Sequence, residues 1–181
     1  FGDDQVPHDA VLVRVIRSAH HYASFKIGDK AAFLAEQPGI LAVLDASDVP
    51  GRNCFGVIPP FADQPVFAEK TALYRGDAVA AIVGDPDSVS RFDEADFPIS
   101  WEPHDTMLTP ESATSSGAPK LHNSRDGNIL VRGYVECGDA DKALAAAKHQ
   151  VNVRTKTPFI EHAYIEPESG YAVPEGSKIV I

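Results

Sequence analysis

The chain has 181 residues, 44% of them hydrophobic, and its 26 acidic against 16 basic side chains give it a net charge of −10. A net-acidic surface argues against nucleic acid and anionic membrane as partners, because both need clustered lysine and arginine. No apolar run approaches the roughly 20 residues that cross a bilayer, and no basic-then-apolar signal peptide opens the chain, so we expect a cytoplasmic protein with free thiols at Cys54 and Cys137.

Strands and short helices alternate through the first part of the chain. The β-branched run at 11–17 and the alternating residues 23–27 predict two strands, and 40–44 predicts a short apolar third. Between the second and third strands, Asp29 is expected to cap a short helix over 30–37. This order of strand, strand, helix and strand is typical of a mixed α and β unit.

Residues 45–65 follow as a long turn-rich segment with several prolines. The segment holds four large apolar side chains, Phe55, Val57, Ile58 and Phe61. Exposed together, they would form an adhesive patch on the surface. We therefore expect them to pack against something outside this part of the chain.

An unbroken apolar run at 78–83 predicts a central strand that is buried on both faces. If Gly76 makes a positive-φ turn just before it, a valine there should destabilise the domain. Asp85 and the proline after it predict the start of a helix that runs to about Ala95, followed by a strand at 97–101. The acidic residues in this region follow no metal-ligand spacing, so a solvated surface explains them.

The composition changes after this α+β or α/β module. Residues 106–128 are rich in Ser, Thr, Pro, Gly and Asn and show no hydrophobic period, so we interpret them as a linker or surface strap. A helix capped by Asp139 is then predicted over 139–148. Strands are predicted around it, at 129–135, 151–155, 159–164, 171–173 and 178–181. They have too few partners to form a sheet of their own, and the chain ends inside one of them, so we expect a piece of a longer protein.

The sequence offers few candidates for chemistry. It contains no G-x-G-x-x-G, P-loop or G-x-S-x-G segment and no CxxC, so nucleotide-binding, nucleophile-elbow and iron–sulfur motifs are missing. Glu161, His162 and Glu166 are of the residue types that bind metals, but in a predicted strand positions 162 and 166 stand ~13 Å apart, too far for one ion. We expect no metal site here. A buried His–carboxylate pair that holds the backbone is favoured, and a place near a substrate or cofactor is the alternative for His162 and Glu166.

Four segments, in the same order along the chain, are similar to motifs of one enzyme family. Residues 17–20, RSAH, are similar to the motif R-S-P-H, and residues 38–51, PGILAVLDASDVPG, are similar to P-G-V-x-A-V-x-T-x-x-D-x-P-G. Residues 67–80 contain FAE and YRGDAVA, which are similar to L-A-x-x-x-V-R-Y-x-G-E-P-V-A. Residues 161–170, EHAYIEPESG, are similar to Q-x-H-x-x-x-E-P-x-x-G. Together they resemble the molybdenum hydroxylases, the family of xanthine dehydrogenase, aldehyde oxidase and their bacterial relatives. The chain departs from the pattern at Ala19, where the family has Pro, and at Asp77-Ala78, where it has Glu-Pro.

The resemblance implies an α+β fold: an a/b hammerhead domain over 1–105, a crossing strap over 106–128, and the truncated start of a molybdopterin-binding domain over 129–181. In such enzymes a molybdenum–molybdopterin cofactor hydroxylates a carbon of an aldehyde or a purine-like N-heterocycle with water as the oxygen source. Electrons leave through iron–sulfur clusters, often to FAD. The family's catalytic glutamate follows a Gly-rich segment that this chain does not contain, so no catalytic residue and no firm cofactor-binding residue is assigned here.

The partners that the resemblance implies are the remainder of the molybdopterin-binding chain, an iron–sulfur subunit or domain, and a second copy of the protein. On this hypothesis the chain is scaffold and interface and is inactive alone. The rival hypothesis is a free-standing module that binds a small molecule or a protein around Phe55–Phe61 without catalysis. A metal enzyme that uses His162 and Glu166 is disfavoured by the strand geometry.

Overall fold

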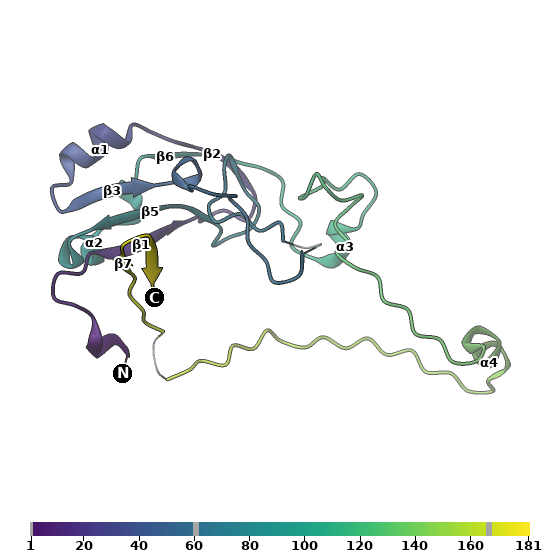
Figure 1. The fold of residues 1–181 in the computed structure, drawn as a ribbon. Helices are drawn as coiled ribbons and strands as arrows, with labels where there is room; N and C mark the ends of the chain where they lie inside the picture. Colours follow the sequence, from purple (N-terminus) through teal and green to yellow (C-terminus); the bar gives the residue numbers. More distant parts are fainter. Residues whose placement is uncertain (1, 60–61, 166–167) are drawn as a thin grey trace.

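A computed structural model of the chain describes residues 2–59, 62–165 and 168–181. Its N-terminal part holds two three-stranded antiparallel sheets (Figure 1). The first sheet has the order β1 (Leu12–Arg17), β5 (Ala78–Gly84), β3 (Ile40–Leu44), and the second has the order β4 (Thr71–Ala72), β2 (Ala23–Ile27), β6 (Ile99–Pro103). Among its described residues, this part also holds helices α1 (Lys30–Glu36) and α2 (Pro86–Arg91) and the 3-10 turns η1 (Gly2–Gln5), η2 (Ala46–Asp48) and η4 (Glu94–Asp96).

Both predicted helix starts are confirmed. The Asp29 carboxylate accepts hydrogen bonds from the N–H groups of the first turn of α1, and Asp85 caps α2 with Pro86 in its first turn. However, α2 ends at Arg91 rather than near Ala95, because Phe92 has an extended backbone. A separate turn, η4, follows it.

The predicted central strand is confirmed as β5, which lies between β1 and β3 and is almost wholly buried. Ile82 in β5 is completely inaccessible to solvent. A side chain on Gly84 would collide with the backbone of Gly39, so this close approach of β5 and β3 needs glycine. Phe33 of α1 packs edge-on against Phe92 and Phe97, each ring 5.7 Å away, and closes the core.

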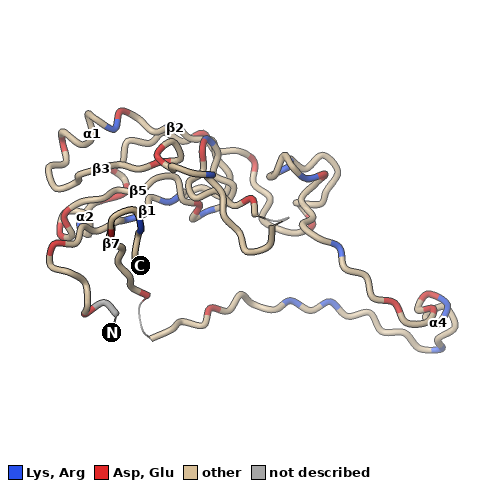
Figure 2. The backbone as a smooth tube through the Cα atoms, in the orientation of Figure 1, with Lys and Arg blue, Asp and Glu red and all other residues tan. Residues whose placement is uncertain are grey.

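The acidic residues around α2 are exposed, as predicted. Figure 2 shows their positions in red along the backbone at α2. Two of them, Asp85 and Asp93, cap the helix and the turn that follows. Glu94 pairs with Arg14 of β1 at 3.0 Å, and Asp87 pairs with Arg91 of α2 at 3.0 Å. These contacts give Asp85, Asp93 and Glu94 structural roles at the surface.

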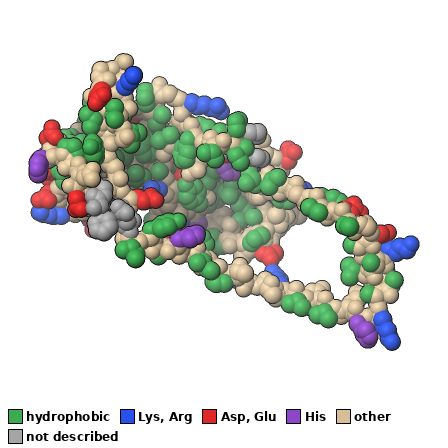
Figure 3. Space-filling model, turned by 60° about the horizontal axis from the view of Figure 1, so that its bottom comes forward, with side chains coloured by type: hydrophobic (Ala, Val, Ile, Leu, Met, Phe, Trp, Pro, Cys, Tyr) green, Lys and Arg blue, Asp and Glu red, His purple; other side chains and the backbone are tan. Residues whose placement is uncertain are grey.

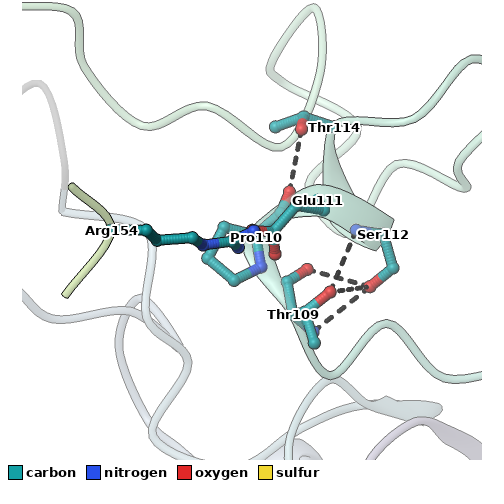
Figure 4. Close-up of polar contacts among 6 residues, drawn as sticks. All are labelled: Thr109, Pro110, Glu111, Ser112, Thr114 and Arg154. Atoms are coloured by element: carbon teal, nitrogen blue, oxygen red, sulfur yellow. Dashed lines mark hydrogen bonds and ion pairs between the residues drawn. The ribbon is translucent and has the colours of Figure 1, made fainter. Parts of the chain in front are cut away.

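The strap, residues 106–128, contains a one-turn helix that the sequence analysis missed, α3 (Pro110–Ala113). Figure 4 shows its capping box, in which the Thr109 hydroxyl accepts from the Ser112 N–H at 3.1 Å while the Ser112 hydroxyl accepts from the Thr109 N–H at 3.2 Å. Figure 4 also shows Arg154 reaching back to Glu111 from the segment beyond the strap, at 2.7 Å. Both of these charged side chains are mostly exposed, so the pair contributes little stability.

The C-terminal part departs most from the sequence predictions. Helix α4 (Ala140–Ala146), capped by Asp139, is confirmed, but the strands predicted at 129–135, 151–155 and 159–164 are wrong. Residues 129–165, called the arm here, run out to α4 and back as extended chain without strand pairing (Figure 1). Among the described residues of this part, β7 (Val173–Glu175) and β8 (Lys178–Val180) are the strands that pair, and they pair with each other. A strand needs a neighbouring strand for its hydrogen bonds, and the described chain offers the arm none.

Candidate functional site

Two of the motif segments meet in space although they are far apart in the sequence. The Ser18 N–H donates to the Asp77 carbonyl and the Gly76 N–H donates to the Ser18 carbonyl, both at 2.8 Å. The Arg17 guanidinium donates to the Gly76 carbonyl at 2.8 Å. Gly76 has a φ of +98°, so the positive-φ turn expected before β5 is present. Residues 17–20 and 74–80 therefore form one structural unit.

Asp77 is the charged residue at the centre of this unit. It is 4% exposed and, with Ser18, makes up the buried polar side chains of the described residues. Burial raises the pKa of Asp77 above the ordinary range, and hydrogen bonds from the Leu73 and Ala78 N–H groups and the Tyr74 hydroxyl partly offset that rise, as does the charge of Arg17. With its oxygens held by backbone donors, this carboxylate fixes the turn that leads into β5.

A pocket of about 480 Å³ lies beside this turn, between residues 63–77 and residues 121–130. We call the contacts between these two segments the junction. Four of the polar side chains that line the pocket are paired with each other: Arg125 with Asp63 at 2.6 Å, and Gln64 with the Tyr74 hydroxyl at 3.4 Å. Because these groups satisfy one another, the pocket has the character of a joint between segments rather than of a ligand site.

The turn-rich segment is a loop whose two ends, at Asn53 and at Val66 and Phe67, are joined by hydrogen bonds, and we call it the tied loop. The Asn53 side chain donates to the Phe67 carbonyl at 2.8 Å and accepts from the Val66 and Phe67 N–H groups at 3.0 and 3.1 Å. Within the tied loop, the side chain of Val57 is 99% exposed and that of Phe55 is 51% exposed. Ile58 is exposed as well, and Phe61 lies outside the described residues, so the expected packing of these side chains against another part of the protein stays a prediction.

The C-terminal candidates are not assembled into a site. His162 is exposed and stacks on Tyr164, with ring centroids 5.9 Å apart, and its backbone N–H donates to the Glu161 carboxylate at 3.0 Å. The expected burial of His162 is therefore wrong, whereas its pairing with a carboxylate at Glu166 stays a prediction. Glu166 lies outside the described residues. A role for His162 and Glu166 near a cofactor stays a prediction.

The side chains of Asn53 and Asn128 each make several hydrogen bonds in this region, and neither was singled out from the sequence. Their bonding partners lie up to about 20 positions away, beyond the reach of local turn patterns. Within the part of the chain that the structure describes, no three His, Cys, Asp or Glu side chains gather as they would around a metal ion. Nor does any described helix have the length and apolar character to cross a membrane.

Comparison with known proteins gives matches over both parts of the chain. Residues 1–102 match the family model "Aldehyde oxidase and xanthine dehydrogenase, a/b hammerhead domain", and residues 121–181 match "Molybdopterin cofactor-binding domain". A probable xanthine dehydrogenase subunit of Bacillus subtilis is 34% identical over 163 residues, covering 90% of this chain and 21% of that protein. The nicotinate dehydrogenase large molybdopterin subunit of Eubacterium barkeri is 32% identical over 184 residues, covering 100% of this chain and 42% of that protein.

Solved structures share the fold. Quinoline 2-oxidoreductase of Pseudomonas putida 86 aligns with a TM-score of 0.60 at 21% identity, over 72% of this chain and 17% of that one. Aldehyde oxidoreductase of Desulfovibrio gigas aligns with a TM-score of 0.59 at 19% identity, over 68% and 15%. The chain spans 21% to 42% of the length of the two curated relatives named above.

Proposed function

Because this chain belongs to the aldehyde oxidase and xanthine dehydrogenase family, we propose that it forms part of the molybdopterin-binding subunit of a molybdenum hydroxylase. The observation that carries the proposal is the succession of two matches, hammerhead then cofactor-binding domain, along one chain. When bound, the molybdenum–molybdopterin cofactor would supply the chemistry that oxidises a substrate carbon, with the oxygen atom taken from water. The substrate proposed is an aldehyde or a purine-like N-heterocycle, and relatives are named for xanthine and nicotinate.

Within that enzyme, the role proposed for this chain is scaffold and interface. The described residues do not by themselves fit a bound pterin cofactor, because every described residue from 129 onward is exposed. The polar groups at the junction are bonded to one another and so hold segments together. The chain's own residues thus bind and orient polypeptide, and the catalytic groups are proposed to lie in other parts of the protein.

The partners proposed are the remainder of the cofactor-binding chain and an iron–sulfur subunit or domain, with FAD on a further domain or subunit and a second copy of the protein as an additional partner. The support is the exposure of large apolar side chains in two places. Phe159 and Ile165 in the arm are 92% and 97% exposed, and Val57 on the tied loop is 99% exposed. Apolar surface of this kind marks protein contacts. Figure 3 shows hydrophobic side chains all along the arm.

The experiment that tests the proposal is the intact mass and molybdenum content of the natural protein, purified from its own cells. A chain several times heavier than 19.4 kDa, with about one molybdenum per chain, is the expected result. A 19.4 kDa chain without molybdenum would refute it. In that case the second candidate, a free-standing binding module that uses the exposed Phe55 and Val57, would take its place.

A further inference from the structure

The strap is attached to the hammerhead part through residues that match two different family models. Asp63 lies in the segment that matches the hammerhead model, whereas Arg125 lies in the segment that matches the cofactor-binding model. Their ion pair, with 2.6 Å between Arg125 Nη2 and Asp63 Oδ2, bridges the two. The Arg125 side chain is 18% exposed, so this pair is better shielded from water than the largely exposed pairs Arg91–Asp87 and Arg154–Glu111.

Asn128 organises the strap itself. Its Oδ1 accepts from the Leu121 N–H at 3.0 Å, and its Nδ2 donates to the carbonyls of Ala113 at 3.0 Å and Pro119 at 2.9 Å. The Met107 sulfur lies 3.7 Å from the same nitrogen. One side chain thus holds together several parts of the strap, in which α3 is a helix of a single turn.

These contacts require an amide at position 128. An amide group has both a donor and an acceptor end, and here each end is used. A carboxylate of the same size would keep the bond from Leu121 but would set its negative oxygen against two carbonyl oxygens. An aliphatic side chain would lose every one of these bonds.

We infer that Asn128 is a positioning residue, which holds the strap in one conformation so that the chain enters the arm at a fixed point on the hammerhead surface. Arg125, close to it in the sequence, ties that conformation to Asp63. The inference rests on the proposed function, because it takes the arm to be the start of the cofactor-binding domain. It adds to that function a specific residue that sets where the domain begins.

The test is hydrogen–deuterium exchange, followed by mass spectrometry, on the full-length natural protein with its partners. Wild type is compared with N128A and N128D. The amides of residues 109–121 should exchange about tenfold faster or more in both variants, because the amide donors that hold two strap carbonyls are gone. The matched control is E111Q, which removes the exposed partner of Arg154 and should leave exchange in the strap unchanged.

N128D separates positioning from the filling of space, because the two side chains have nearly the same volume. If strap exchange in N128D equals that of wild type, the inference is overturned. If the amide donors matter, lowering the pH to protonate the introduced carboxyl restores one donor. Protection, measured against wild type at the same pH, should then recover in N128D and not in N128A. Recovery in both variants would also overturn the inference.

The two proposals fail in different ways. A natural protein without molybdenum refutes the proposed function and leaves the exchange result standing. A molybdenum-containing protein whose N128D variant keeps wild-type protection refutes the positioning role and leaves the function intact.

Discussion

Lys30, in the first turn of α1, pairs with two carboxylates of the η2 turn, and its Nζ lies 2.7 Å from Asp45 Oδ2 and 2.9 Å from Asp48 Oδ2. The hydrogen bond from Lys30 is the main reason that the pKa of Asp48 lies below its usual range, and the Asp45 N–H assists. For Asp45, burial acts to raise the pKa, but hydrogen bonds from Lys30 and Ser47 outweigh it and the net shift is downward. The carboxylates therefore favour the folded state only while ionised.

Asp48→Asn should make the fold less sensitive to acid. Since the folded pKa is depressed, the Asp48 carboxylate stabilises the fold above its unfolded pKa of about 3.9, and this contribution is lost as the pH falls through the folded pKa. Urea unfolding at about pH 6 and about pH 3 measures the fall in stability, which we expect to be smaller in the variant. Asp87→Asn, which breaks an exposed pair with Arg91, serves as the control. An equal fall in D48N and wild type would contradict the assignment.

Asp77 supports a different prediction, because it is buried and its pKa is raised. Asp77→Ala leaves the Leu73 N–H without its acceptor and should lower the free energy of unfolding by about 1–3 kcal/mol. Asp77→Asn keeps an acceptor oxygen and removes a charge that is costly to bury, so its loss should be clearly smaller. Denaturant unfolding near neutral pH measures both, and equal losses would show that the acceptor is not what matters.

At the scale of the elements, the turn before β5 depends on Gly76. A Cβ there would meet nothing within 4 Å, so the cost of substitution comes from the backbone, whose φ is +98°. Gly76→Val should lower the free energy of unfolding by about 1–2 kcal/mol or somewhat more, because a β-branched residue tolerates positive φ poorly. Gly51→Val, at an open position without positive φ, is the matched control. A melting temperature unchanged by G76V would refute the role of this turn.

A strand could be predicted correctly from the sequence where its pairing partner lies within this chain. Strands such as β1 and β5 were predictable because their apolar patterns match burial within the chain. The strands expected in the arm have similar patterns, but Val135 is 98% exposed and has no neighbouring strand to pair with among the described residues. The helix α3 escaped notice because its sequence, PESA, has no apolar period. The link between Asn128 and Ala113 could not be predicted, since only the folded strap brings them together.

At the scale of the molecule, the two ends of the chain differ in how well they are packed. The apolar core lies within residues 16–97, whereas every described residue from 129 onward is exposed. Limited proteolysis of this chain alone should therefore cut first within the arm, and fragments ending near residues 129–165 should appear before any cut in 11–103. The same arm within the full-length natural protein should resist cleavage if further polypeptide covers it. Early cleavage inside 11–103, identified by fragment mass, would contradict this division.

The pairing of β1 with β5 also has a consequence for synthesis of the protein. Leu12 lies opposite Gly84 and Arg17 lies opposite Ala78, so β1 is synthesised well before the strand with which it pairs. At the usual ~5–20 residues per second, the ribosome needs several seconds to bridge that interval. During this time the apolar residues of β1 lack their partner strand, and we expect that chaperones at the ribosome can bind them.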